Sequence, residues 1–255
     1  MTSPDSNNPY QVPSAEVVGS ESSNGYSNQP HRVPAGNGMT WVSDAWKLFL
    51  KAPGPLVLIT FLYGLINLVL PFIPVVGFLA PLPATVIMGG YYVVLDKLDH
   101  EGEARVEDLF APFSTHLTPL LLLGLIMVGM SVLGTILIMA TGMNLMMGGI
   151  DHLGAGSLFV ILMVVLLVIS AILLVYFAVF YATILVVVGN QSVGEAMSNS
   201  FSAGLHNVMP FLVYSLVSLG IMIVASVPLF LGFLVATPVL FGANYMSFKD
   251  IFSKE

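Results

Sequence analysis

Long apolar runs, each without a charged side chain or a histidine, recur along this sequence after residue 53. They cover residues 54–71, 75–95, 118–139, 157–182, 208–226 and 229–246. A helix needs about 20 apolar residues to cross the hydrocarbon core of a bilayer, because its backbone groups can pair only with one another there. The runs predict an all-α fold, a polytopic membrane helix bundle with six transmembrane helices in three hairpins.

The composition excludes a water-soluble fold. Charged residues make up 8% of the 255 residues and apolar residues 56%, whereas a typical soluble domain is about 25% charged. Too few polar side chains remain to cover a water-facing surface. The chain has no cysteine, which excludes disulfides, thiolate metal sites and thiol nucleophiles. Its net charge of −7 argues against nucleic acid as a partner, because nucleic-acid binding needs a basic face.

The first 40 residues differ in composition from the rest of the chain. Ser, Asn, Pro and Gly make up more than half of them, and no apolar run occurs among them. Such a segment buries too little surface to offset its chain entropy. The sequence therefore predicts a disordered cytoplasmic tail over residues 1–40, followed by a six-span membrane domain over residues 41–255.

The placement of lysine and arginine predicts the orientation of the spans. With six spans, all seven basic residues fall in the N-terminal tail, in the loop between the second and third spans, or in the C-terminal tail: Arg32, Lys47, Lys51, Lys97, Arg105, Lys249 and Lys254. These three segments share one side of the membrane. Because lysine and arginine near span ends concentrate on the cytoplasmic side, we expect both termini in the cytoplasm.

A three-fold internal pattern underlies the hairpins. Each odd-numbered span is preceded by an aromatic residue nine positions before a proline: Trp46 and Pro55, Phe110 and Pro119, Phe201 and Pro210. Apolar residues at helical spacing precede the first two spans clearly and the third more weakly. The pattern predicts a short amphipathic interfacial helix before each hairpin, with each proline in the first turn of a span.

Aromatic residues gather at the predicted membrane borders. Rings with one wet edge are typical anchors at the headgroup level. We expect interfacial anchoring by seven of them: Trp41, Trp46, Phe110, Phe201, Tyr91, Tyr92 and Tyr245.

Polar chemistry within the predicted spans is sparse. The spans contain no ionisable residue, which argues against a proton-coupled pump or a voltage sensor. Asn67 and Thr60 are candidate intramembrane polar contacts. On the predicted outer side, Asp151 and His152 form the one charged or titratable pair, which is a weak basis for catalysis. We therefore expect no catalytic site, no metal and no cofactor, and a protein that is not an enzyme.

Several short segments resemble a family of uncharacterised bacterial inner-membrane proteins, known as a domain of unknown function. The resemblance lies in residues 41–49, in residues 107–113 and in residues 245–252, with a further echo over residues 195–201. The last of these is also similar to its counterpart in the membrane domain attached to some glycerophosphodiester phosphodiesterases. The resemblance implies a six-span fold and the bacterial inner membrane, and it implies no activity.

Two functions remain open. The first is a non-enzymatic membrane scaffold or accessory protein that acts through membrane lipids, a membrane-protein partner or a second copy of itself. The alternative is a facilitator, transporter or channel for a small or amphipathic solute, because proline-interrupted spans and internal repeats are typical of transporters. A polar cavity lined by Asn67 and Thr60 would favour the alternative, and a fully packed bundle would favour the scaffold.

Overall fold

A computed structural model describes residues 26–27, 29–73, 76–148 and 154–253 of the chain. Within these ranges every regular element is a helix, apart from one isolated β-bridge between Tyr26 and Ser253. The all-α class is confirmed. The predicted disorder of residues 1–25 and the Asp151–His152 pair lie outside the described residues.

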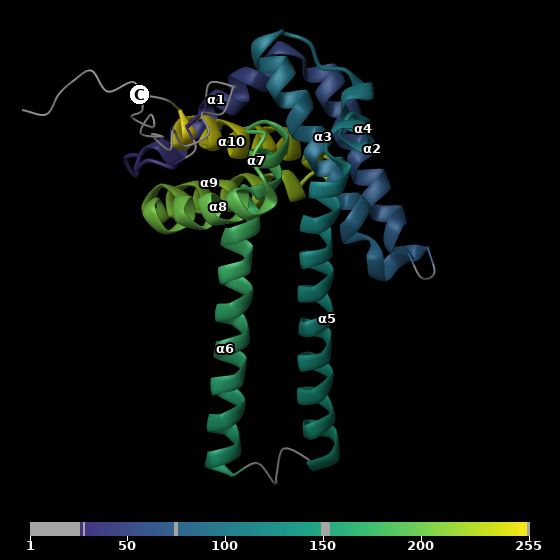
Figure 1. The fold of residues 1–255 in the computed structure, drawn as a ribbon, viewed down its shortest axis with the longest axis vertical. Helices are drawn as coiled ribbons and strands as arrows, with labels where there is room; N and C mark the ends of the chain where they lie inside the picture. Colours follow the sequence, from purple (N-terminus) through teal and green to yellow (C-terminus); the bar gives the residue numbers. More distant parts are fainter. Residues whose placement is uncertain (1–25, 28, 74–75, 149–153, 254–255) are drawn as a thin grey trace, which may run out of the picture.

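The helices fall into three consecutive units (Figure 1). Unit 1 comprises α1 (Asn37–Lys51), α2 (Pro53–Val69), the 3₁₀ turns η1 (Leu70–Phe72) and η2 (Val76–Leu79), and α3 (Pro81–His100). Unit 2 comprises η3 (Val106–Phe110), α4 (Pro112–Thr115), α5 (Leu117–Gly148), α6 (Ala155–Phe180) and α7 (Ala182–Val187). Unit 3 comprises α8 (Val193–His206), α9 (Val208–Ser226) and α10 (Phe233–Phe252).

Each unit is a short helical segment followed by a helical hairpin, in the predicted order. We call α1, η3 with α4, and α8 the prelude helices. Pro55, Pro119 and Pro210 all lie in the first turn of the helix that follows a prelude helix, where the missing N–H of proline leaves no bond unmade. The third prelude helix begins with a capping box, in which Ser192 and Glu195 satisfy each other's backbone N–H.

The three units close into a ring. The prelude helix of unit 2 packs on α3 of unit 1, and that of unit 3 packs on α6 and α7 of unit 2. The prelude helix of unit 1, α1, packs on α10 of unit 3. Each prelude helix therefore covers the second helix of the preceding unit, and the first and last described helices complete the cycle.

Residues without a bulky side chain allow these close contacts. A Cβ atom at Gly90 of α3 would overlap the backbone carbonyl of Leu109 in η3. A Cβ atom at Gly242 of α10 would lie 3.1 Å from the Cβ of Ala45 in α1. Small residues let helices approach closely. In a membrane this close packing matters because the exclusion of water drives little association between helices. The contacts at Gly90 and Gly242 are therefore two of the close points of the ring.

Three helical segments are long and apolar enough to cross a membrane: Pro53–Phe72, Leu117–Ile136 and Val208–Ser226. Each begins the hairpin of its unit. This finding, which covers only the described residues, indicates a membrane protein.

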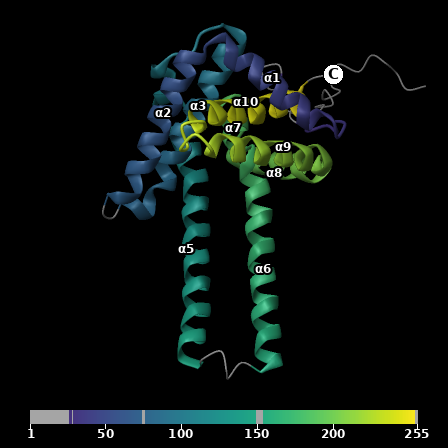
Figure 2. The ribbon, with the colours of Figure 1, turned by 180° about the vertical axis from the view of Figure 1, so that it is seen from behind.

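The hairpins do not form one parallel bundle. In both views, α5 and α6 extend together away from the rest of the molecule, whereas α8, α9 and α10 run crosswise to them (Figures 1 and 2). The predicted six-span bundle needs all three hairpins to share a direction. Hydrophobic length sets which segments can span, but side-chain packing sets their crossing angles. The contact of Gly38 on α1 with the backbone of Pro210 and Tyr214 on α9 belongs to that packing.

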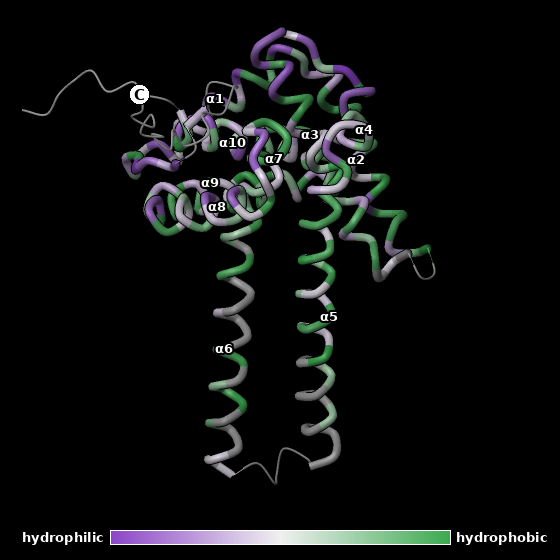
Figure 3. Tube along the Cα trace, viewed as in Figure 1, coloured by the Kyte–Doolittle hydropathy of each residue, from purple (hydrophilic) through white to green (hydrophobic). Residues whose placement is uncertain are grey.

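Polar residues gather away from the tips of α5 and α6. Figure 3 shows hydrophilic residues around the turn between α3 and η3 and along α8, whereas the sides of α2 and the upper part of α5 are mostly hydrophobic. Many large apolar side chains face outward, for example Leu68 and Met209, which are 64% and 65% exposed. An outer surface of this kind suits contact with lipid.

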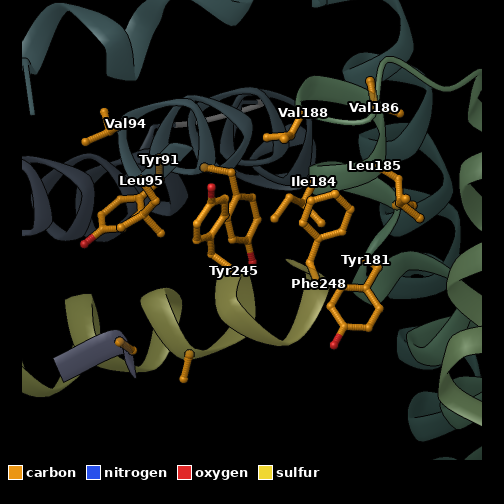
Figure 4. Close-up of a cluster of buried hydrophobic side chains, with 14 of the residues drawn as sticks. Tyr91, Val94, Leu95, Tyr181, Ile184, Leu185, Val186, Val188, Tyr245 and Phe248 are labelled. Atoms are coloured by element: carbon orange, nitrogen blue, oxygen red, sulfur yellow. The ribbon is translucent and has the colours of Figure 1, made fainter. Parts of the chain in front are cut away.

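The core lies where the ring of units meets. Tyr91 of α3, Tyr181 at the end of α6 and Tyr245 of α10 are fully buried, and Phe248 lies among them (Figure 4). The hydroxyls of Tyr91 and Tyr181 are paired, with Thr60 Oγ1 at 2.6 Å and with Ser247 Oγ at 2.5 Å. Each unit thus contributes at least one buried tyrosine to a common core.

The folded part of the chain begins before the predicted boundary at residue 41. The backbone N–H of Ser27 donates to the carbonyl of Phe252 at 2.7 Å, and that of His31 donates to the carbonyl of Ile251 at 3.0 Å. The side chain of Asn207, which is fully buried, accepts from the N–H of Val33 at 2.9 Å and donates to the carbonyl of His31 at 3.0 Å. Residues 26–27 and 29–36 therefore form a strap across α10 and the α8–α9 junction, where backbone groups of α10 and the side chain of Asn207 pair with the backbone of the strap.

Candidate functional site

A cavity of about 780 Å³ lies where the three hairpins meet. Residues of α2, α3, α5, α9 and α10 and the α6–α7 junction line it. Its polar lining residues are Tyr63, Thr85, Tyr92, Thr183, Tyr214, Ser215, Ser218 and Asn244. The volume is within the range of about 300–1,000 Å³ that ligand sites usually occupy.

Asn244 is the most constrained polar group of this cavity. It lies on α10 and is 6% exposed. Its Nδ2 donates to the hydroxyl of Tyr92 on α3. Among the residues that the structure describes, its Oδ1 has no hydrogen-bond partner. A buried acceptor that stays unpaired costs about 1–3 kcal/mol.

Ser218 on α9 has the same property. Its Oγ is buried and has no hydrogen-bond partner within the described part of the chain. Other polar groups of the lining bond to nearby backbone. The hydroxyl of Tyr214 donates to the carbonyl of Leu240 at 3.1 Å, and that of Thr85 donates to the carbonyl of Pro81 at 2.7 Å. Ser218 Oγ on α9 and Asn244 Oδ1 on α10 are therefore the two buried polar atoms of the lining that have no partner among the described residues.

The rest of the lining is apolar. Met88 of α3, Met127 of α5 and Met222 of α9 are among the cavity residues, together with Phe180 and Phe241. None of the described lining residues carries a formal charge. Methionine side chains are flexible and polarisable, so they can adapt to apolar groups of different shape. The cavity is suited to an uncharged molecule with an apolar part.

A second hollow opens between α1, α9 and α10. This groove of about 760 Å³ is lined by apolar side chains apart from Ser43. Val42 and Trp46, two residues of the predicted amphipathic stripe, line it. The face of α1 that enters the core is instead made by Trp41, Ala45, Leu48 and Phe49.

The structure corrects four of the predicted anchors. Trp41, Tyr91, Tyr92 and Tyr245 are each less than 3% exposed, so they contact protein rather than lipid headgroups. They are buried because the prelude helices and α10 close over them, which a linear pattern does not reveal.

The remaining predicted anchors reach the surface. Trp46 and Phe110 are each 45% exposed, and Phe201 is half-buried. Trp46 stacks on Phe49 with ring centroids 5.5 Å apart. Anchoring by Trp46, Phe110 and Phe201 stays a prediction.

The two predicted intramembrane contacts lie outside the cavity lining. Thr60 is 5% exposed and is paired with the hydroxyl of Tyr91. The Nδ2 of Asn67 donates to the carbonyl of Tyr63 in its own helix at 2.9 Å. Sequence reasoning missed the pairing of Asn244 with Tyr92 and the role of Ser218. The sequence signal for Asn244 was an amide side chain within an apolar run. Asn67 has the same signal, so the sequence does not distinguish the two residues.

An ionic cluster joins α3 and α1 of unit 1 to α10 of unit 3. Asp99 of α3 pairs with Lys249 of α10 and, at 3.3 Å, with Lys51 of α1. The hydroxyl of Tyr245 donates to Asp96 Oδ1 at 2.9 Å. Burial opposes ionisation of Asp99, but the hydrogen bonds and charges of Lys249 and Lys51 outweigh it and lower the pKa of Asp99. Lys97 pairs with the buried carboxylate of Asp108 at 2.6 Å, which raises the pKa of Lys97.

Comparisons with models of known protein families, with curated proteins and with solved structures found no match. The resemblance to a family of uncharacterised bacterial inner-membrane proteins, which covers roughly residues 40–255, therefore stays a prediction.

Proposed function

We propose that this protein is an integral membrane protein that binds a small or amphipathic uncharged solute in the cavity around Asn244 and facilitates its passage. The observation that carries the proposal is the buried Oδ1 of Asn244, which has no partner among the described residues, on a side chain that lines a cavity of about 780 Å³. A scaffold has no need of such a group, and a packed helix bundle would pair it.

We further propose six spans in the bacterial inner membrane, with both termini in the cytoplasm. The support is the hairpin of each unit and the gathering of polar residues away from the tips of α5 and α6 (Figure 3). Six spans require α9 and α10 to run beside α5 and α6, whereas they cross them in Figure 1. The tip of the α9–α10 hairpin is therefore the decisive place to test.

The topology is testable because the chain has no cysteine of its own. Single variants Phe72→Cys, Gly154→Cys and Leu229→Cys place a thiol at each hairpin tip, and Glu103→Cys is the cytoplasmic control. We expect a membrane-impermeant maleimide to label the three tips in intact spheroplasts and to label Glu103→Cys only after lysis. An unlabelled Leu229→Cys that also resists labelling after lysis would mean that this hairpin ends within the bilayer.

The solute function is tested in liposomes. Purified protein is reconstituted, and glycerol entry is followed by light scattering after an osmotic step. We expect faster entry than in empty liposomes and a return to the empty-liposome rate in Thr85→Trp, whose side chain would fill the cavity. Gly129→Trp, at a position with open space around it, is the control. Equal rates with and without protein for glycerol, and no binding of an amphipathic probe, would remove the proposal.

A scaffold role is the second candidate. The apolar groove between α1, α9 and α10 supports it, because an exposed apolar hollow in a membrane can take a lipid chain or a partner helix. Purification in mild detergent with identification of bound lipids and proteins tests this role. A stoichiometric protein partner that is lost in Val217→Trp would favour it over solute binding.

A further inference from the structure

We infer that the cavity selects an uncharged lipid-like molecule bearing a hydroxyl group, and that this hydroxyl donates its hydrogen bond to Oδ1 of Asn244. The inference rests on the proposed function and names the chemical class of its solute.

The charge of the lining limits which molecules can enter the cavity. No lysine, arginine, histidine, aspartate or glutamate is among the described residues that line the cavity. A charge moved from water into such surroundings without a partner is strongly disfavoured. Fatty acids, amines and phosphate esters are therefore excluded as the part of the molecule that enters.

The buried polar atoms of the lining determine which polar group the cavity prefers. The Tyr92 hydroxyl accepts one N–H of Asn244, and among the described residues the amide oxygen is the atom that has no partner. An oxygen acceptor distinguishes a donor such as a hydroxyl from an ether or an ester, which has no hydrogen to give. Ser218 Oγ, on the facing helix α9, is a second buried group without a partner among the described residues, and it can donate to the oxygen of the same hydroxyl.

The apolar lining of the cavity accommodates the rest of the bound molecule. Three methionines from three different helices line the cavity, namely Met88, Met127 and Met222. Flexible thioethers accommodate an alkyl chain without fixing its length. We therefore expect the cavity to require the hydroxyl of the ligand and to accept alkyl chains of different length.

The test uses three probes with the same alkyl chain: dodecanol, dodecyl methyl ether and dodecanoate. Their binding to purified protein is measured by competition with a neutral fluorescent probe at about pH 8. We expect dodecanol to bind about tenfold more tightly than the ether, which is the value of one hydrogen bond to a buried acceptor. Dodecanoate is expected to bind most weakly.

Variants assign the preference to the amide. Asn244→Leu should abolish the difference between dodecanol and the ether while the ether still binds, and Ser218→Ala should weaken the binding of both, because its hydroxyl can donate to the oxygen of either. Tyr92→Phe frees Nδ2 of Asn244 and should raise the affinity for the ether. Asn67→Leu, outside the cavity, is the matched control and should bind all three probes as the unaltered protein does. A thermal melt of each variant verifies folding.

The outcomes separate the inference from the proposed function. If the unaltered protein binds dodecanol and the ether equally, the hydroxyl selection is wrong while solute binding stands. Tighter binding of the ether than of the alcohol would mean that the amide N–H faces the cavity, which also overturns the inference. Dodecanoate that binds as tightly as dodecanol overturns the exclusion of charge. If no probe binds and glycerol entry is unchanged, the proposed function itself fails.

Discussion

The indole Nε1 of Trp41 donates a hydrogen bond of 2.7 Å to Oδ2 of Asp250, and this bond links the first helix, α1, to the last, α10. The Nδ2 of Asn37 donates to the same oxygen at 2.8 Å. Trp41 itself is 2% exposed. One carboxylate thus fixes the start of α1 on the end of α10 and completes the ring of units.

Removing this carboxylate should weaken the ring. We expect Asp250→Ala to lower the free energy of unfolding by about 3 kcal/mol, because two hydrogen bonds to a charged group are lost and the buried indole N–H keeps no partner. Unfolding of purified protein by SDS measures the change. Asp44→Ala is the control, since Asp44 pairs with Lys47 on the surface of α1 and should change stability by less than about 1 kcal/mol. Equal effects of the two variants would show that the link does not hold the ring.

A side chain at the tight contact between α3 and η3 should also be destabilising. Gly90→Val places a Cβ against the carbonyl of Leu109, and overpacking of this kind costs about 1–3 kcal/mol. We expect a lower melting temperature in detergent. Gly64→Ala is the control, because nothing lies within 4 Å of a Cβ there. A melting temperature of Gly90→Val equal to that of the control would mean that η3 is not packed on α3.

The ionic cluster predicts a dependence of stability on pH. The pKa of Asp99 is lower in the folded protein than its ordinary value of about 3.9 because of Lys249 and Lys51. Its contribution is therefore fully present above about pH 4 and is lost as the pH falls through the folded pKa. We expect Lys249→Met to flatten the loss of stability as the pH falls below about 4, and the exposed Lys47→Met to leave it unchanged. Parallel pH profiles for all three proteins would contradict the assignment.

The strap over residues 26–27 and 29–36 should depend on Asn207. In Asn207→Ala the N–H of Val33 and the carbonyl of His31 lose their side-chain partner. We expect faster hydrogen exchange at Val33 and faster proteolysis of the strap, with the helices intact. Asn199→Ala, whose Nδ2 donates only to the side chain of Gln191 among the described residues, should leave both rates unchanged. Unaltered exchange at Val33 would show that the strap is held elsewhere.

The sequence was sufficient to predict the helices but not the angles at which they cross. Apolar runs and the spacing of Pro55, Pro119 and Pro210 predicted the hairpins and their prelude helices, because helix length and proline placement are local properties. The start of α8 also had a local signal, the capping box of Ser192 and Glu195, which the apolar pattern missed. The crosswise course of α9 depends on contacts between distant segments, so no local pattern contained it.

The same distinction explains the candidate site. Tyr91 and Tyr245 are aromatic residues near predicted span ends, and that position alone favours lipid headgroups. Their burial depends on which unit packs on which, and the ring of units is not visible in any single hairpin. Asn244 and Asn67 are both amides within apolar runs. Only the assembled helices place Asn244 on the cavity wall and leave Asn67 bonded to its own helix.

The packing of α1 on α10 sets an order of events during biosynthesis. Among the described helices, the ribosome makes α1 first and α10 after all the others. Until α10 has been made, the indole of Trp41 lacks its partner Asp250, and the face of α1 that packs on α10 is uncovered. A chain cut short before α10 therefore keeps that face of α1 uncovered.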